Sequence, residues 1–592
     1  MLARGDGGCG VADGSMDFLS LLGTLETASP QARIAAYQAW IAAHPADLAM
    51  LPVAWTNLGA SFGAVGDRVN AIACYRNALH LRPDLAAAAL NLGLTQEQLG
   101  DSDAALAAWR SALQPDAARV ALLNQCGRLL ENSGALDDAE RTLHASLRTD
   151  PAQPDVIQHW VHLRQKLCRW PIFAAGSSGL ADATLARHAG PLATLALTDR
   201  VAAQTEAAAD WIARKLPNTR QRLSPATGYS HRRLRIGYLS SDFCSHAMSY
   251  LVAETFELHD RNSFEIFGYC SSRDDNSAIR ARVIAGFDHF VPINTMSDEA
   301  AAQRIRADEI DVLIDLNGLT LGARLDLLRW RPAPVQITYL GYIGPVPLPE
   351  LDYFICDTET VPDGAAYQPA PLHLPFVFQA NDSARPTPPS LTRAEAGLPE
   401  QGFVFCCFSN SYKMTEGMVT AWCDILHAVP GAWLWLPSDN GTASENLRAA
   451  AARAGLDPAR LIFSERVAPD VYLARLGAAD LFLDTFPYNA GTIASDALRM
   501  GLPLVTLRGE SFASRMAASL LTAIGAPEGI VDTRESYIAK AIQLAHDPAA
   551  HTSFRARIGL ERWRATLGNT KRFVAGLEAA LRKVAQRKQI AA

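Results

Sequence analysis

The segment with the clearest capacity for chemistry runs from residue 484 to residue 496 and reads DTFPYNAGTIASD. It follows a short apolar run, passes through a turn of small residues, and is expected to start a helix. Unpaired backbone N–H groups at Gly491, Thr492 and Ile493, together with the helix dipole, suit a diphosphate held without a metal. Asp496, one turn further on, is placed to accept hydrogen bonds from ribose hydroxyls. On this segment alone, an ordinary capped helix start explains the pattern equally well.

Other common nucleotide and nucleophile motifs do not occur in the sequence. There is no GxGxxG, no GxxxxGK[ST] and no GxSxG, which disfavours NAD enzymes and P-loop NTPases. The 10 cysteines show no CxxC or Cys/His spacing of a zinc site, so no metal is expected and buried, reduced cysteines are the simpler interpretation. The formal net charge of −7 argues against a nucleic-acid-binding surface over the whole protein, and no nucleic-acid partner is expected.

The sequence shows no targeting or membrane segment. No apolar stretch approaches the ~20 residues that span a bilayer. The first residues, MLARGDGGCGVADGSMDF, lack the apolar core and small-residue cleavage site of a signal peptide. We therefore expect a cytoplasmic protein without a membrane partner, and a disordered Gly/Asp-rich start over residues 1–20.

The downstream half of the chain alternates short apolar runs with helical stretches such as Glu299–Ala307. Continuous apolar strands separated by helices indicate parallel sheets covered on both faces. A polar, proline-rich segment, 378–393, is interpreted as a linker between two such domains. Two domains in series place a ligand cleft between the carboxyl ends of their strands. The expected strands are Leu234–Leu239, Phe264–Tyr269, Val312–Leu316, Val335–Leu340, Tyr353–Cys356, Phe403–Phe408, Trp433–Leu436, Leu461–Phe463, Leu481–Asp484 and Leu504–Leu507.

The upstream part of the chain repeats itself every 34 residues, the period of tetratricopeptide repeats. Each unit predicts two antiparallel helices, in which small residues such as Gly59 and Ala71 permit close approach and Gly66-Asp67 makes the turn. Three units are clear across 51–151, a degenerate unit precedes them, and helical segments follow to about 220. Such arrays present a concave surface for peptides or proteins, so we expect recognition here and chemistry downstream. The recurring residues are Gly59, Gly93 and Gly127; Gly66, Gly100 and Gly134; Ala71, Ala105 and Ala139; and Leu79, Leu113 and Leu147.

Nine strings of the downstream half carry a resemblance to a known family: LRIGYLSSDFCSHAMSY, IDVLIDLNGLT, RPAPVQITYLGY, DYFICDTET, FSNSYKMT, LIFSERVAP, ADLFLDTFPYNAGT, DALRMGLPLVT and GESFASRMAASLL. From Leu234 to about Phe573 the chain resembles glycosyltransferase family 41, which contains O-GlcNAc transferase and the plant protein SPINDLY. The upstream repeats complete that family's architecture, and a bacterial homologue fits the small number of repeats.

This resemblance implies an α-solenoid of tetratricopeptide repeats followed by a GT-B catalytic unit of two Rossmann-like domains. The implied divisions are 21–225 for the repeats and repeat-like helices, 226–385 for the first catalytic domain, and 386–592 for the nucleotide-sugar-binding domain with its C-terminal helix. The implied reaction is inverting transfer of GlcNAc from UDP-GlcNAc to Ser or Thr hydroxyls of proteins docked in the repeat groove, with no cofactor or metal required.

The resemblance implies two catalytic residues. His246, in SSDFCSH, matches a family histidine close to the sugar and the acceptor, where a neutral ring could polarise an acceptor hydroxyl. The base itself could be His246, a water chain or the donor's own phosphate. Lys413, in FSNSYK, matches a lysine on the donor diphosphate, where a cation stabilises the charge that develops on departing UDP.

Further residues are implied to bind the UDP part of the donor. Asn410 stands where the family has a glutamine on the diphosphate, and Ala468 lies where backbone groups recognise uracil. Tyr472 occupies the position of a ring stacked on uracil, although a core aromatic would look the same. The implied UDP-binding residues are Asn410, Lys413, Ala468, Tyr472, Gly491, Thr492, Ile493 and Asp496.

Asn317, Thr320 and Gly341 are implied to line the position of the N-acetylhexosamine. The chain departs from the animal pattern nearby, because Ile343 stands at a family proline, and a lysine that follows VAP is Asp470. These changes bear on the donor site more than on the fold. Two other functions stay open: a GDP-fucose-dependent protein O-fucosyltransferase of the SPINDLY type, and a repeat scaffold with a decayed catalytic unit.

Overall fold

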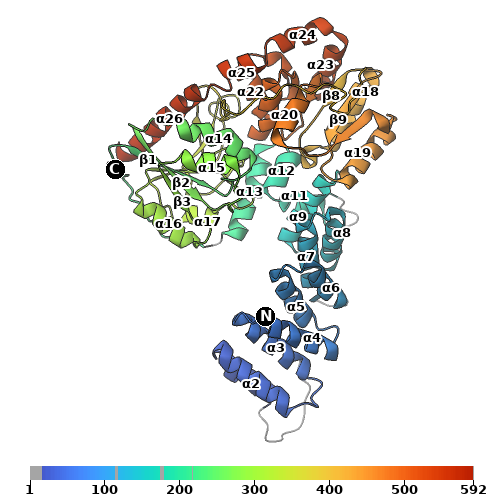
Figure 1. Cartoon of the computed structure of the whole chain (residues 1–592), viewed down its shortest axis with the longest axis vertical. Coiled ribbons are helices and arrows are strands. Elements are labelled where there is room, and N and C mark those ends of the chain that lie inside the picture. Colours follow the sequence, from blue (N-terminus) through green and yellow to red (C-terminus); the bar gives the residue numbers. More distant parts are fainter. Residues whose placement is uncertain (1–16, 114–117, 174–178, 217, 591–592) are drawn as a thin grey trace. The chain divides into compact units, whose positions relative to one another are not determined.

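The computed structural model describes residues 17–113, 118–173, 179–216 and 218–590, and the chain forms two compact units (Figure 1). The first comprises residues up to Leu163 with Ala175–Ala181, and the second comprises Arg164–Ala174 with all residues from Asp182 onward. Within the described ranges, no helix is long and apolar enough to cross a membrane.

The first unit is a series of helices that pair in sequence order, as the 34-residue period predicts. A Cβ on Gly59 would lie 2.6 Å from the ring of Tyr75, so the absence of a side chain lets that ring lie directly on the neighbouring helix. Gly66, Gly100 and Gly134 take φ values of 82°, 83° and 81°, as the turn between paired helices requires. The helices are α1 (Phe18–Leu25), α2 (Pro30–Ala43), α3 (Leu51–Ala64), α4 (Arg68–Leu81), α5 (Ala86–Gln98), α6 (Ser102–Ser111), α7 (Ala118–Asn132), α8 (Leu136–Thr149) and α9 (Pro154–Lys166), the last of which continues into the second unit.

Most of the N-terminal segment expected to be disordered, residues 1–16, lies outside the described residues. Helix α1 begins at Phe18, so its first three residues lie inside the segment 1–20 that was expected to be disordered. Phe18 is buried, and its ring packs 4.7 Å from that of Trp40, so apolar burial orders the chain from this point.

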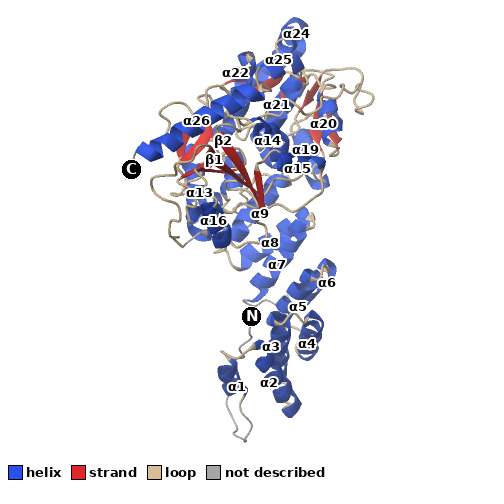
Figure 2. Cartoon of the chain, turned by 60° about the vertical axis from the view of Figure 1, so that its left-hand side comes forward, coloured by secondary structure: helices blue, strands red, loops and turns tan. Residues whose placement is uncertain are grey.

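The second unit opens with the helices α11 (Asp182–Arg187), α12 (Pro191–Leu197) and α13 (Val201–Lys215), which lie within the segment 21–225 assigned above to the repeats. Two parallel sheets follow, with strand orders β3-β2-β1-β4-β5-β6-β7 and β10-β9-β8-β11-β12-β13. Figure 2 shows their strands (red) among helices (blue). The predicted fold class, a repeat solenoid followed by two Rossmann-like domains of GT-B type, is confirmed.

The first sheet contains β1 (Leu234–Ser240), β2 (Phe264–Cys270), β3 (His289–Pro292), β4 (Val312–Asp315), β5 (Val335–Thr338), β6 (Tyr353–Cys356) and β7 (Ala370–His373). Its helices are α14 (Ala247–Leu258), α15 (Ala278–Ala285), α16 (Asp298–Ala307) and α17 (Leu325–Arg329). The order reverses between β1 and β4, and this switch point is where doubly wound sheets place their ligands.

The second sheet contains β8 (Val404–Cys406), β9 (Trp433–Pro437), β10 (Leu461–Ser464), β11 (Leu481–Leu483), β12 (Leu504–Leu507) and β13 (Ile530–Val531). Its helices and short 3₁₀ turns are η1 (Ser411–Lys413), α18 (Glu416–Ala428), α19 (Gly441–Arg453), η2 (Pro458–Arg460), α20 (Pro469–Leu476), α21 (Thr492–Arg499), η3 (Phe512–Ser514), α22 (Met516–Ile524), η4 (Pro527–Gly529), α23 (Arg534–His546), α24 (Pro548–Ala556) and α25 (Leu560–Ala565). Its order reverses between β8 and β11, directly beside the segment 484–496.

All ten expected strands are present, and three further strands, β3, β7 and β13, were not predicted. Each of the three lies at an edge of its sheet and pairs with one neighbour. Edge positions are partly exposed, so β3 reads as the mixed string HFVP and β7 as APLH, without the continuous apolar run of a central strand.

The segment interpreted as a linker, 378–393, has no regular structure, but its first part is buried. Asp382 is 3 % exposed and its carboxylate pairs with the Arg282 guanidinium at 2.5 Å. Glu254 of α14 accepts hydrogen bonds from the backbone N–H and the hydroxyl of Ser383 at 2.6 and 2.8 Å. The connection between the two sheets is therefore fixed to the first domain by charged contacts.

The C-terminal helix, α26 (Thr570–Ile590), packs against α14 of the first Rossmann-like domain (Figure 1). Its Glu578 accepts hydrogen bonds from the ring N–H of His259 at 3.0 Å and from the backbone N–H of Asp260 at 2.8 Å. The chain thus returns to the first domain after completing the second.

Candidate active site

A buried carboxylate shapes the loop that precedes α21. Asp484, fully buried after β11, accepts hydrogen bonds from the N–H groups of Thr485 and Ala490, both at 2.8 Å. Its second oxygen accepts from the Thr506 hydroxyl at 2.7 Å. Burial raises the pKa of Asp484 to about 7, and these hydrogen bonds oppose that rise. The loop 484–491 is therefore held from inside, by a side chain that does not face solvent.

The N-terminus of α21 carries backbone donors that have no partners among the described residues. Gly491 is its N-cap, with φ −105°, and no side chain caps the helix. In the part of the chain that the structure describes, no acceptor pairs with the N–H groups of Thr492 or Ile493. A Cβ on Gly491 would lie 3.1 Å from Gln379 Oε1, so a larger residue would crowd this end of the helix. The arrangement leaves backbone donors for an anion.

Lys413 lies beside this helix start. Its Nζ donates to the carbonyl oxygen of Asn489 at 3.1 Å and lies 3.5 Å from the centre of the Tyr488 ring. Burial lowers the pKa of Lys413 to about 8, and the nearby carboxylate of Asp484 opposes that change. A half-buried cation and free N–H groups thus occupy the same edge of the second sheet.

Asn410 immediately precedes η1, and its side chain has protein partners. Its Oδ1 accepts a hydrogen bond from Arg466 Nη2 at 3.2 Å. The same amide also hydrogen-bonds the Tyr412 side chain, so Asn410 lies between Arg466 and Tyr412. Arg466 lies in the string LIFSERVAP but was not among the predicted site residues.

Ala468 and Tyr472 belong to α20, where Ala468 is the exposed N-cap residue. The Tyr472 ring packs edge-on to that of Phe408, with centres 6.2 Å apart. Its hydroxyl is buried and has no hydrogen-bond partner among the described residues. The ring is therefore part of the packing under α20, while its polar end is left unsatisfied.

Asp496 lies in the second turn of α21 and is 6 % exposed. Its Oδ1 accepts from Arg385 Nη1 at 3.1 Å. Burial raises the pKa of Asp496, while Arg385 and Arg499 act in the opposite direction. Arg385 comes from the segment interpreted as a linker, and charged linker residues give no sequence signal that distinguishes a buried contact from a solvated one.

On the other sheet, Asn317 follows β4 and is 2 % exposed. Its Oδ1 accepts from the Ser241 N–H at 2.8 Å, and its Nδ2 donates to Ser241 Oγ at 2.8 Å and Asp242 Oδ2 at 2.9 Å. The Thr320 hydroxyl donates to the Asn317 carbonyl oxygen at 2.9 Å. Asn317 therefore ties the loop after β4 to the loop after β1, while Thr320 closes a turn within the loop after β4.

Gly341 lies against the loop that contains Asn317. A Cβ at this position would overlap the carbonyl oxygen of Leu316 and lie 2.9 Å from the Cα of Asn317. The preceding residue, Leu340, adopts φ +70°, which is uncommon for a side chain other than glycine. Close contact between two backbones explains the glycine.

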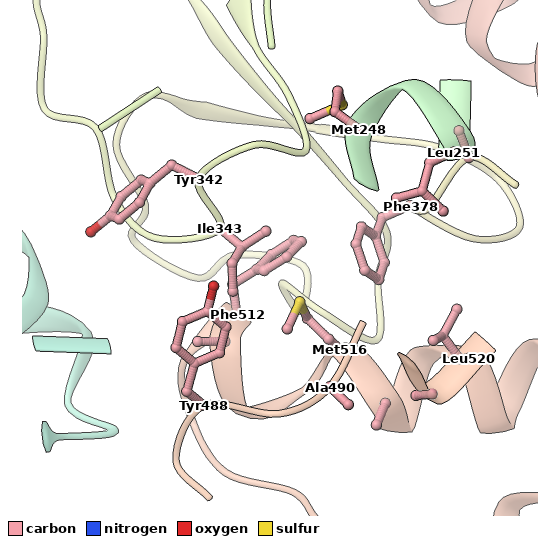
Figure 3. Close-up of a cluster of buried hydrophobic side chains, with 14 of the residues drawn as sticks. Met248, Leu251, Tyr342, Ile343, Phe378, Tyr488, Ala490, Phe512, Met516 and Leu520 are labelled. Carbon is pink, nitrogen blue, oxygen red and sulfur yellow. The ribbon is translucent and has the colours of Figure 1, made fainter. Parts of the chain in front are cut away.

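The residues after Gly341 pack into an apolar cluster where the two Rossmann-like domains meet (Figure 3). Figure 3 shows Tyr342 and Ile343 of the first domain beside Tyr488 and Phe512 of the second. Ile343, the departure from the family proline, is 4 % exposed. Its side chain fills this junction.

His246 is the N-cap residue of α14, and its Nδ1 accepts from the Met248 N–H at 3.2 Å. The same nitrogen lies 3.7 Å from Asp242 Oδ2, and the side chain is 52 % exposed. Because Nδ1 acts as the acceptor, the neutral ring carries its proton on Nε2. Asp242 Oδ2 lies near both site residues: it accepts from Asn317 Nδ2 and is 3.7 Å from His246 Nδ1.

The loop 509–514 is held by two further residues. Asp199, which was not predicted as a site residue, accepts from the N–H groups of Glu510 and Ser511 at 2.6 and 3.0 Å. Arg515 donates to the Gly509 carbonyl oxygen at 2.9 Å and to Glu359 Oε1 at 3.2 Å. Arg515 thus bridges the two Rossmann-like domains and holds a loop that lies beside Asn489.

The model of "Glycosyl transferase family 41" matches residues 211–375 and 379–577, more than half of the chain. A protein of Arabidopsis thaliana named "Probable UDP-N-acetylglucosamine--peptide N-acetylglucosaminyltransferase SEC" is 36 % identical over 356 residues, which are 59 % of this chain and 36 % of the relative. A Caenorhabditis elegans protein named "UDP-N-acetylglucosamine--peptide N-acetylglucosaminyltransferase" is 28 % identical over 462 residues, which are 59 % of this chain and 40 % of that one.

Among solved structures, a mutant of the Thermobaculum terrenum O-GlcNAc transferase is 27 % identical and superposes with a TM-score of 0.64, covering 92 % of this chain and 99 % of that one. The chain spans well under half of the length of the two curated relatives. The match to the family model nevertheless covers both Rossmann-like domains almost completely. The chain belongs to glycosyltransferase family 41.

Proposed function

We propose that the chain is an inverting glycosyltransferase that moves GlcNAc from UDP-GlcNAc to Ser or Thr hydroxyls of proteins. The observation that carries this proposal is the pairing of an uncapped helix start with a cation. The N–H groups of Thr492 and Ile493 lack partners among the described residues, and Lys413 is bonded to the carbonyl of Asn489, two residues before the helix cap. A diphosphate satisfies both the donors and the charge.

In this proposal Lys413 stabilises the leaving group. When the bond from the anomeric carbon to the β-phosphate oxygen breaks, negative charge grows on UDP. The Lys413 ammonium is held by Asn489 and Tyr488 before the substrate arrives, so it needs no reorganisation. Its low pKa, about 8, still leaves it mainly protonated at neutral pH.

Asp496 binds the ribose and Tyr472 lies under the base. Asn410 offers its side-chain amide to the diphosphate from the loop after β8, three residues before Lys413. Ala468, at the exposed start of α20, offers backbone groups to the uracil. These roles agree with the family resemblance and with the position of each residue at the carboxyl edge of the second sheet.

His246 acts at the acceptor and sugar side as a hydrogen-bond donor. Its Nδ1 caps α14, so Nε2–H is the group available to a hydroxyl. Acting as a base through Nε2 would require the other tautomer and would break that cap. Asn317, Thr320 and Gly341 hold the loops that form the sugar pocket, and attack opposite to UDP inverts the anomeric centre.

Protein acceptors dock on the array of helix pairs. The paired helices and their glycine turns build the repeats that bind extended peptides in other arrays. Each repeat contacts its neighbours only, so the surface offered to an acceptor extends along the array.

Calorimetric titration of UDP, GDP, UDP-GlcNAc and GDP-fucose into the purified chain tests the nucleotide, with Lys413→Met alongside. We expect selective binding of UDP and UDP-GlcNAc that weakens in the variant. Selective binding of GDP would move the chain to the fucosyltransferase function, and no binding of any nucleotide would favour a scaffold. Mass spectrometry of acceptor proteins incubated with UDP-GlcNAc then checks for a gain of one N-acetylhexosamine.

A further inference from the structure

The ion pair between Arg385 and Asp496 joins two segments that are far apart in the sequence. Asp496 lies in α21, at the edge of the second sheet, while Arg385 belongs to the connection between the two sheets. The Arg385 Nη1 lies 3.1 Å from Asp496 Oδ1, and the two side chains are 11 % and 9 % exposed. A carboxylate this deeply buried needs a charged partner, because solvent does not stabilise it.

Arg385 is itself held firmly in place. Its backbone carbonyl oxygen accepts from the Arg499 guanidinium, which also donates to Thr387 Oγ1 at 2.5 and 3.0 Å. Its guanidinium lies 5.6 Å from the centre of the Tyr250 ring. Tyr250 is one turn into α14, the helix that His246 caps. The arginine is therefore fixed at its backbone by α21 and at its charged end by α14.

Two polar groups beside this ion pair lack hydrogen-bond partners among the described residues. Within the described residues, Asp496 Oδ2 has no hydrogen-bond partner, and the buried hydroxyl of Tyr472 has none. The charged and titratable groups that act on Asp496 are Arg385 from the connection, Arg499 from its own helix and Tyr472 from α20. A carboxylate with one oxygen paired and the other open can accept from a diol.

We propose that Arg385 is a positioning residue for the ribose of the nucleotide: it keeps Asp496 as a carboxylate and orients Oδ2 to accept from the ribose hydroxyls. This inference rests on the proposed function, since it takes UDP as the ligand. It extends that function by assigning the ribose contact to a pair of residues, one of which lies outside the nucleotide-binding domain. It also connects the ribose to α14, which carries His246 at its start.

Arg385→Met tests the proposal with two probes, UDP and 2′,3′-dideoxy-UDP, titrated by calorimetry between pH 6 and pH 9. In the parent protein we expect UDP to bind at least about tenfold more tightly than the dideoxy compound, independently of pH, on the scale of a charge-assisted hydrogen bond. In the variant we expect that ratio to fall below about threefold at pH 7 and to recover as the pH rises. Titration of the phosphate and of Lys413 affects the binding of both probes equally, so it does not change the ratio of their affinities.

Arg385→Gln provides a second route if the methionine variant does not fold, because glutamine can keep the contact to Asp496 without its charge. The same pH-dependent loss is expected, while Arg385→Lys should restore a pH-independent ratio. Arg393→Met is a matched control: that arginine pairs with Asp480 at 2.5 Å, at the opposite end of β11. It should leave the ratio unchanged.

A parental, pH-independent ratio in both uncharged variants would overturn the role of Arg385. Equal binding of the two probes by the parent protein would overturn the ribose contact while leaving UDP binding, and so the proposed function, intact. No binding of UDP by the parent protein would remove the proposed function and this inference together.

Discussion

The Nζ atom of Lys413 lies 3.1 Å from the carbonyl oxygen of Asn489 and 3.5 Å from the centre of the Tyr488 ring. One side chain thus touches the loop that leads into α21 and the apolar cluster where the two domains meet. The position of this cation is set by packing on both sides, so a change of charge here can be made without removing the loop's main support, which is Asp484.

Lys413→Met is expected to lower kcat by about 10²–10³, the scale on which loss of one oxyanion-type contact acts. Methionine keeps a chain of similar length over Tyr488, so the melting temperature should not fall. Transfer is measured with radiolabelled UDP-GlcNAc and an acceptor protein. Lys571→Met, which alters an exposed lysine of α26, serves as the control and should keep the parental rate. Parental turnover by Lys413→Met would exclude the assigned role.

The affinity for UDP should depend on the charge of Lys413. Because burial lowers the pKa of this lysine to about 8, the free protein loses the cation as the pH rises above that value. We expect the Kd for UDP to be constant from pH 7 to about 8 and then to rise, approaching tenfold per pH unit. Calorimetry from pH 7 to pH 9.5 measures this slope.

Lys413→Arg is the matched variant for this pH dependence, because a guanidinium stays protonated throughout the range. Its Kd should be nearly flat with pH, even if binding is weaker overall. A steep rise of the Kd with pH in both the parent and the arginine variant would mean that a group other than Lys413 titrates.

The fold was largely predictable because its signals are local. Central strands such as Val312–Asp315 are buried on both faces and read as continuous apolar runs. The helix start at Thr492 follows from small residues after a strand, and the repeat turns follow from their period. The edge strand His289–Pro292 was missed because solvent covers part of it.

Residues of the site could be predicted only where a single segment of the sequence contains them. Arg385, Arg466 and Asp199 each act through partners more than 50 residues away, at Asp496, Asn410 and the 509–514 loop. Nothing in the local sequence distinguishes such residues from solvated charges.

Gly341→Ala should destabilise the protein and impair transfer. The new Cβ would overlap the Leu316 carbonyl oxygen, and the two backbones would have to separate, at a cost of about 1–3 kcal/mol. Gly417→Ala in α18 is the control, because a Cβ there meets nothing within 4 Å and alanine favours the helix. Thermal unfolding compares the two variants, and an equal melting temperature for both would contradict the close backbone contact.

The contact between α26 and α14 should make stability depend on pH. His259 is fully buried: its Nδ1–H donates to Glu578 at 3.0 Å, and the Tyr238 hydroxyl donates to its Nε2 at 2.8 Å. Burial lowers the pKa of His259, and Glu578 opposes that change.

Since the folded pKa lies below the unfolded value of about 6.5, the unfolded chain takes up the proton first as the pH falls. The stabilising contribution of neutral His259 is therefore complete above about pH 7 and decreases on acidification. His259→Asn removes this titration, so the difference in melting temperature between parent and variant should shrink from pH 7.5 to pH 5.5. Thr420→Asn, at an exposed position of α18, removes no titratable group and should show a constant difference over the same range. A constant difference for His259→Asn as well would mean that this ring does not couple the C-terminal helix to protonation.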